Sequence, residues 1–133
     1  MENLYIEPTE ITPRVDFDSK IKKFELSGVS RPEDVVAFYE SIIFKIEKYI
    51  NQLLKNENTI ANIKFHLVFD LNYINSASSK YILQILGLFK KIYLKGATVT
   101  CTWYYEDLDD QILEDGEDLS DVIKMDFEFL ERQ

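Results

Sequence analysis

The sequence predicts an α/β fold in which two long helices and a short acidic C-terminal helix pack on a mixed β-sheet of about five to six strands. Two segments, 63–73 and 97–105, alternate apolar and polar residues. Alternation is typical of strands with one buried face. Two others, about 35–55 and 76–94, repeat apolar residues at three- and four-residue steps. That spacing places the apolar residues on one face of a helix.

The N-terminal segment predicts short strands at the edge of the sheet. Apolar residues alternate around 4–6 and again around 15–17, and Pro8 and Pro13 lie between these two pieces. Proline has no N–H to donate to a neighbouring strand, so such segments favour edges or bulges. A third strand is expected at 21–26.

The first long helix has a start signal and an end signal. Ser30 is the expected N-cap, Glu33 would complete a capping box, and Pro32 is tolerated in the first turn. The apolar stripe runs from Val35 to about Lys55. Asn56 and the polar residues after it are expected to end the helix.

The C-terminal third continues the pattern. Trp103 and Cys101 lie on the apolar side of the strand 97–105, so both are predicted to be buried. Residues 106–121 are densely acidic with a spaced apolar edge, which fits a short helix or two. Phe127 and Phe129 indicate a last short strand.

Length and charge narrow the class of protein. The chain has 133 residues, 46% of them hydrophobic, and carries a net charge of −9. This length predicts one domain, 1–133. The negative charge argues against nucleic acid and anionic membranes as partners. With one cysteine and no apolar stretch long enough to span a bilayer, we expect a soluble cytoplasmic protein.

The usual catalytic and metal-binding patterns do not match. A calcium loop starting at Asp107 fails, because Gln111 and Ile112 occupy its fifth and sixth positions. His66 has no cysteine or histidine at metal spacing, and there is no glycine-rich phosphate loop. We therefore expect a non-enzyme with no cofactor and no metal site.

The junction between the strand 63–73 and the helix 76–94 carries the candidate site. Asn75 and Ser76 fall where the period changes, and Ser78, Ser79 and Lys80 follow in the first turn. Ser and Asn at a helix start are usually caps. One cap needs one oxygen, however, and here three serines follow the most hydrophobic strand. A helix N-terminus also favours a negative group, because its amides are free and its dipole is positive there.

Several stretches resemble the SiaC family of regulatory phosphoproteins, within the STAS-like fold of bacterial anti-sigma-factor antagonists. They are Thr12-Pro13-x-Val15-x-Phe17-Asp18, Pro32-Glu33-Asp34 with Phe38-Tyr39, Tyr73-Ile74-Asn75-Ser76-x-Ser78, and Val99-x-Cys101-x-Trp103-x-Tyr105. Together they span nearly the whole chain in order. Ser76 stands where the family often has threonine, and Arg31 replaces an aromatic residue.

The resemblance implies a STAS-like domain that acts as a partner switch. A serine/threonine kinase of the histidine-kinase-like ATPase fold would phosphorylate the protein, and a PP2C-like phosphatase would remove the phosphate. The unmodified protein would bind a signalling effector such as a diguanylate cyclase, in cyclic di-GMP signalling. By position Ser76 is the expected phosphoacceptor, with Ser78 and Ser79 as fallbacks. The expected partner-binding residues are Asn75, Ser76, Ser78, Ser79 and Lys80.

Two other readings remain open. The same helix terminus could bind a small anion or a nucleotide. Phosphate or a nucleotide would then raise the melting temperature of the protein. An enzyme is the third reading, supported only by the acidic segment and scattered hydroxyls. Neighbouring kinase and phosphatase genes would favour the switch, and metabolic neighbours would favour the other two.

Overall fold

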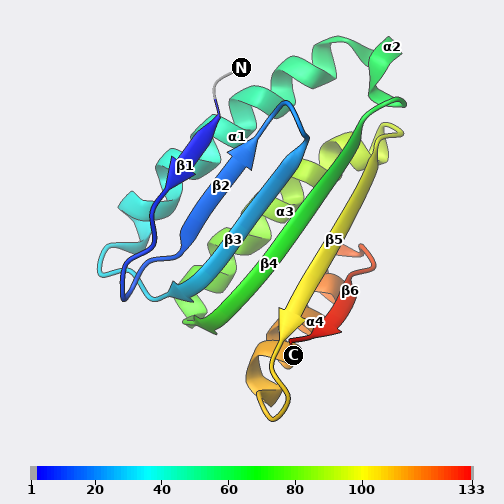
Figure 1. Cartoon of the computed structure of the whole chain (residues 1–133). Coiled ribbons are helices and arrows are strands. Elements are labelled where there is room, and N and C mark those ends of the chain that lie inside the picture. The colour runs from blue at the N-terminus through cyan, green and yellow to red at the C-terminus, as the bar shows by residue number, and fades with distance from the viewer. Residues whose placement is uncertain (1–2, 133) are drawn as a thin grey trace.

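A single six-stranded sheet organises the computed structural model, which describes residues 3–132 (Figure 1). Met1, Glu2 and Gln133, the ends of the predicted domain, lie outside that range. The strands are β1 (Leu4–Ile6), β2 (Arg14–Asp18), β3 (Lys23–Ser30), β4 (Lys64–Ile74), β5 (Thr98–Tyr105) and β6 (Glu128–Glu131). The helices are α1 (Val35–Lys55), α2 (Glu57–Ile60), α3 (Ser76–Leu94) and α4 (Asp110–Ile123).

The strands lie in the sheet in chain order, from β1 to β6. The first three form an antiparallel meander. From β3 onwards each strand pairs in parallel with the next, and α1, α3 and α4 make the connections between them. This arrangement confirms the predicted fold class, a mixed sheet of five to six strands with two long helices and a short acidic one.

All three of these helices lie on the same side of the sheet (Figure 1). The core is therefore a layer between one sheet face and the helices, and it is rich in aromatic rings such as Phe17, Phe65 and Phe89. The Phe65 and Phe89 ring centroids are 4.8 Å apart. Burial of such rings is a main source of stability in a domain of this size.

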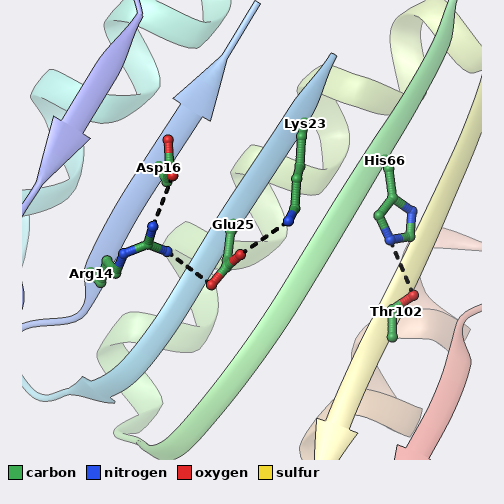
Figure 2. Close-up of polar contacts among 6 residues, drawn as sticks. All are labelled: Arg14, Asp16, Lys23, Glu25, His66 and Thr102. Atoms are coloured by element: carbon green, nitrogen blue, oxygen red, sulfur yellow. Dashed lines mark hydrogen bonds and ion pairs between the residues drawn. The ribbon is translucent and has the colours of Figure 1, made fainter. Parts of the chain in front are cut away.

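Among residues 3–132 no helix covers the other face of the sheet, which carries charged and polar side chains (Figure 1). Arg14 on β2 bonds both Asp16 and Glu25 at 2.9 Å, and Lys23 lies 3.4 Å from Glu25 (Figure 2). Only the Arg14–Glu25 pair joins two strands, since Asp16 lies on β2 with Arg14 and Lys23 lies on β3 with Glu25. Exposed or half-buried ion pairs of this kind contribute modest energy. Polar residues on this face and apolar residues on the other explain the alternation seen in the sequence.

The helix boundaries follow the sequence closely with one correction. The predicted helices at 35–55 and 76–94 are confirmed. The predicted Ser30 cap is wrong. Ser30 is the last residue of β3, and Asp34 caps α1 by accepting from the amide of Ala37 at 3.0 Å. Ser30 does not cap the helix because it still belongs to the sheet, where it pairs in register with Ile74 of β4.

The C-terminal segment packs through the indole of Trp103. Its Nε1–H donates to the carbonyl of Ile112 on α4 at 2.9 Å, and the side chain is fully buried, as predicted. Gly116 lies directly against this ring, since a Cβ there would be 2.5 Å from Trp103 Nε1. A small residue is thus required where α4 crosses the sheet. Within residues 3–132, none of the helices is both long and apolar enough to cross a membrane.

Candidate functional site at the start of α3

The carboxyl end of β4 leads straight into α3, and Asn75 makes the turn. Its backbone is extended, and its side-chain oxygen accepts from the amide of Ser78 at 2.8 Å. This is the geometry of an N-cap, and it satisfies one of the orphan amides of the first turn. The amides of Ser76 and Ala77 belong to the same turn, where no intrahelical acceptor exists. The start of α3 is therefore a well-ordered end with a partial positive charge.

Ser76 is the first residue of α3, and its side chain is exposed. It borders a hollow of about 430 Å³ between the start of α3 and the helix α4. The hollow is lined by Tyr73, Ile74, Asn75, Ser76, Ser79, Gln111 and Asp115. A hydroxyl in this position is open to a large modifying enzyme, and the adjacent space has room for an added group.

Ser78 points the opposite way, into the protein. It is fully buried, and its Oγ accepts from Ser30 Oγ at 2.8 Å and donates to the Ser30 carbonyl at 3.2 Å. Ser30 Oγ is in turn 2.5 Å from the hydroxyl of Tyr39. A buried, bonded hydroxyl is a poor acceptor for a kinase, so the structure disfavours Ser78 as a fallback phosphosite. Ser79 is half-buried and borders the hollow.

The buried hydroxyls join three elements: the end of β3, the second turn of α1 and the first turn of α3. Burial raises the pKa of Tyr39 to about 12, although its hydrogen bonds to Ser30 and Ser78 act in the opposite direction. Tyr39 therefore stays protonated and can donate throughout the physiological range. Its ring stacks on that of Tyr81 of α3, with centroids 5.5 Å apart and planes 7° from parallel.

Gln111 and Asp115 form the α4 side of the hollow. Gln111 Nε2 donates to Asp115 Oδ1 at 2.8 Å. Partial burial raises the pKa of Asp115, and the nearby Asp118 and Asp109 add to that rise against the hydrogen bond from Gln111. A negative group on Ser76 would thus face a carboxylate from α4 and, from its own helix, free amides and the exposed Lys80.

His66 lies away from this site, on the uncovered face of the sheet. Its Nδ1 is 2.6 Å from Thr100 Oγ1. Its Nε2 is 3.4 Å from Thr102 Oγ1 (Figure 2). Burial and the neighbouring Lys23 lower its pKa, while Glu128 raises it. In the part of the chain that the structure describes, no three His, Cys, Asp or Glu side chains come together as metal ligands.

Comparison with known proteins identifies the family. The model of the SiaC family, described as regulatory phosphoproteins, matches residues 6–132. The chain belongs to the SiaC family. This confirms the resemblance drawn from the sequence motifs.

Individual relatives of this SiaC family chain come from Pseudomonas aeruginosa. An uncharacterized protein of strain UCBPP-PA14 is 25% identical over 116 residues, which cover 86% of this chain and 84% of the relative. The crystal structure of apo-SiaC matches with a TM-score of 0.79 at 23% identity over 100% of both chains. A crystal structure of the diguanylate cyclase SiaD in complex with its activator SiaC matches with a TM-score of 0.82 at 22% identity, over 97% of this chain and 99% of that chain. These likenesses show the fold.

In this SiaC family member the structure brings four of the five predicted site residues to the surface, and Ser78 alone lies inside. The sequence interpretation missed Ser30, Tyr39, Gln111 and Asp115. The first two are joined to Ser78 across 48 and 39 residues of sequence, which no local pattern records. The sequence did hold a weak indication for Asp115. It directly precedes Gly116, which lies on the buried edge of α4, so Asp115 lies next to the packed face of that helix.

Proposed function

We propose that this chain is a non-catalytic partner switch controlled by reversible phosphorylation of Ser76. The observation that carries the proposal is the contrast within one helical turn: Ser76 is exposed beside a hollow, whereas Ser78 is sealed in the core. The regulatory phosphoprotein family supplies the context. The proposed modifying enzymes are a serine/threonine kinase of the histidine-kinase-like ATPase fold and a PP2C-like phosphatase.

The effector that we propose is a diguanylate cyclase, because SiaC is the activator of the cyclase SiaD in the complex described above. The unmodified protein would bind the effector across the start of α3. A phosphate adds roughly −1.5 to −2 charges and three strong acceptor oxygens. The free amides of Ser76 and Ala77 and the cation of Lys80 can hold that group without a change of fold. The partner would have to desolvate it, at a high cost.

The test uses the kinase, the phosphatase and the SiaD-like cyclase of the source organism with the full-length chain. Mass spectrometry after incubation with the kinase should find phosphate on Ser76, and the phosphatase should remove it. Cyclase binding should be retained by Ser76→Ala and lost by phosphorylated wild type and by Ser76→Asp. Thr98→Ala, which removes an exposed hydroxyl from the start of β5 at the opposite end of β4 from Ser76, is the control and should behave as wild type. Equal cyclase binding by Ser76→Asp and Ser76→Ala would contradict the proposal.

A second candidate function is a receptor for a small anion or a nucleotide, which the hollow beside the helix terminus favours. The Asp115 carboxylate on its far wall opposes an anion there. Thermal unfolding with inorganic phosphate, ATP and GTP separates the two functions. The switch predicts no concentration-dependent rise of the melting temperature for any of them, whereas the receptor predicts a rise that Ser76→Asp abolishes.

A further inference from the structure

The sheet has an unpaired edge along the first half of β5. This strand extends from Thr98 to Tyr105, but β6 pairs with it only from Thr102 onwards. Within residues 3–132, β4 lies on one side of β5, β6 lies on the other, and no further strand joins the sheet beyond β6. In Figure 1 the upper half of β5 has no strand on its outer side. We call residues 98–101 the open edge.

The peptide groups of Val99 and Cys101 point outward at the open edge. The N–H of Thr98 donates to the carbonyl of Ile63 at 2.9 Å, on the side of β4. Because peptide groups alternate in direction along a strand, those of Val99 and Cys101 face away from β4. A row of such groups at the edge of a sheet is a template for pairing with another chain.

A hollow of about 340 Å³ lies at the open edge. Its lining comes from β4, from β5 and from the segment that enters β6, and consists of His66, Val99, Thr100, Cys101, Thr102, Asp126 and Glu128. The side chains of Val99 and Cys101 belong to the core. A strand added in this hollow would therefore meet their peptide groups rather than their side chains.

Two carboxylates give the hollow its negative charge. Asp126 and Glu128 are exposed, and within residues 3–132 neither takes part in an ion pair. Two cations are near them in sequence. Lys124 does not line the hollow, and Arg132 is paired with Asp70 at 2.8 Å. The two acids are thus available to a cation on a partner.

The other titratable groups of the hollow do not offset these acids. Burial and then Lys23 lower the pKa of His66, while Glu128 acts in the opposite direction, so the imidazole is uncharged at neutral pH. Lys23 itself lies 3.4 Å from Glu25. Burial raises the pKa of the Cys101 thiol, which therefore stays protonated. A basic partner is favoured at this surface.

We propose that the open edge binds an extended, basic segment of a partner protein, which adds a strand to β5 next to the start of β6. The peptide groups of Val99 and Cys101 would bond to that segment, and a Lys or Arg on it would lie beside Asp126 and Glu128. Strand addition takes its affinity from main-chain hydrogen bonds. A second copy of this chain is disfavoured, because each copy carries a net charge of −9.

The open edge is remote from Ser76. His66 is in register with Thr100 of β5, and Ser76 follows His66 by ten residues. At roughly 3.3 Å per residue along a strand, the two places are about 30 Å apart. A partner strand on β5 and an effector at the start of α3 can thus be bound together. This inference is therefore independent of the proposed function.

The experiment measures by calorimetry how tightly the full-length chain binds a synthetic peptide. The peptide alternates Val and Thr between two terminal Arg residues, so that a cation meets Asp126 and Glu128 in either strand direction. Replacing both Arg residues by Glu should weaken binding at least about tenfold. N-methylation of alternate peptide groups should abolish binding in one phase and leave it unchanged in the other, because only one side of the peptide faces β5.

Variants of the chain test the same contacts. Val99→Pro removes an outward N–H and keeps the pairing with β4, since proline is tolerated where the N–H faces away from the sheet. Both Val99→Pro and Asp126→Lys/Glu128→Lys should weaken binding of the Arg peptide at least about tenfold, and the charge variant should gain affinity for the Glu peptide. Glu7→Lys/Glu10→Lys, the control, makes the same change in net charge after β1, at the opposite edge of the sheet, and should bind as wild type does.

Hydrogen exchange gives the second readout. In the free chain the amides of Val99 and Cys101 should exchange faster than that of Thr100, which faces β4, and the Arg peptide should slow only the first two. Equal exchange of the three amides, or no binding of the Arg peptide, would overturn the open edge as a docking site. A dimer in sedimentation that Val99→Pro dissociates would assign the edge to a second copy and overturn the partner strand. Ser76→Asp should bind the peptide as wild type does, whether or not the phosphorylation switch holds.

Discussion

The Oγ atoms of Ser30 and Ser78 are 2.8 Å apart, although 48 residues separate them in the chain. This bond joins the end of β3 to the first turn of α3, and the hydroxyl of Tyr39 extends it to α1. The phosphoacceptor that we propose, Ser76, is two residues away on the outside of the same turn. A buried set of hydroxyls thus holds the element that presents Ser76.

Removing the buried hydroxyl of Ser78 should destabilise the fold. Ser78→Ala takes away the acceptor of Ser30 Oγ and the donor to the Ser30 carbonyl. We expect the free energy of unfolding, measured with urea, to fall by about 1–3 kcal/mol. Ser76→Ala, the exposed control, should change it by less than about 0.5 kcal/mol. The double variant Ser30→Ala/Ser78→Ala should cost less than the sum of the single changes, because both remove the same bond.

Gly116→Ala and Gly87→Ala should have opposite effects, although both glycines lie inside helices. A Cβ at position 116 would come within 2.5–2.7 Å of the Trp103 indole, so α4 must shift. We expect a loss of about 1–3 kcal/mol and a changed Trp103 fluorescence spectrum. At position 87 a Cβ meets nothing within 4 Å. There alanine should add about 0.5–1 kcal/mol of stability. A Gly116→Ala protein as stable as wild type would contradict the packing described here.

Loss of the α3 cap should loosen the start of that helix. Asn75→Ala removes the acceptor for the amide of Ser78. The expected cost is about 1 kcal/mol of unfolding free energy, with faster hydrogen exchange at the Ser78 amide. Asn72→Ala, an exposed residue of β4, is the control and should leave both quantities unchanged. Equal exchange in the two variants would speak against Asn75 as the cap.

Asp115 should make stability depend on pH in a definite direction. Burial raises its pKa in the folded state above the unfolded value, so the folded protein binds the proton more tightly. The contribution of Asp115 to the free energy of unfolding is therefore fully present at low pH. It is lost as the pH rises through the raised pKa of the folded state. Asp115→Asn should remove this loss, so its advantage in melting temperature over wild type should grow with pH and then level off.

Glu114→Gln is the control for Asp115→Asn, because Glu114 is exposed on the same helix. This variant makes the same change in net charge. A pH-dependent advantage of equal size in both variants would assign the effect to the overall charge of the acidic helix rather than to the position of Asp115.

Strong periodicity made the elements around the site predictable. The change from alternation to helical spacing at Asn75 locates the end of β4 and the start of α3, and both boundaries are confirmed. The exposure of Ser76 and the burial of Ser78 were not predictable in this way. They depend on which side of the first turn meets β3, and the partner there, Ser30, is remote in sequence.

Local signals failed where a tertiary contact competes with them. Ser30 and Glu33 match a capping box, but β3 continues its parallel pairing with β4 up to Ser30, and its side chain is needed inside. The helix then begins at the next suitable cap, Asp34. The placement of Asp115 beside Ser76 is of the same kind. That placement depends on the packing of Gly116 against Trp103. The spacing of apolar residues in 106–121 does not predict this contact.

Under the proposed phosphorylation of Ser76, the opposite orientations of Ser76 and Ser78 mean that the folded domain itself withholds Ser78 from the kinase. A kinase that meets the native domain would then have to distinguish Ser76 only from the half-buried Ser79. A peptide copied from residues 70–85, or a denatured chain, lacks that protection, and the enzyme would label it at several positions.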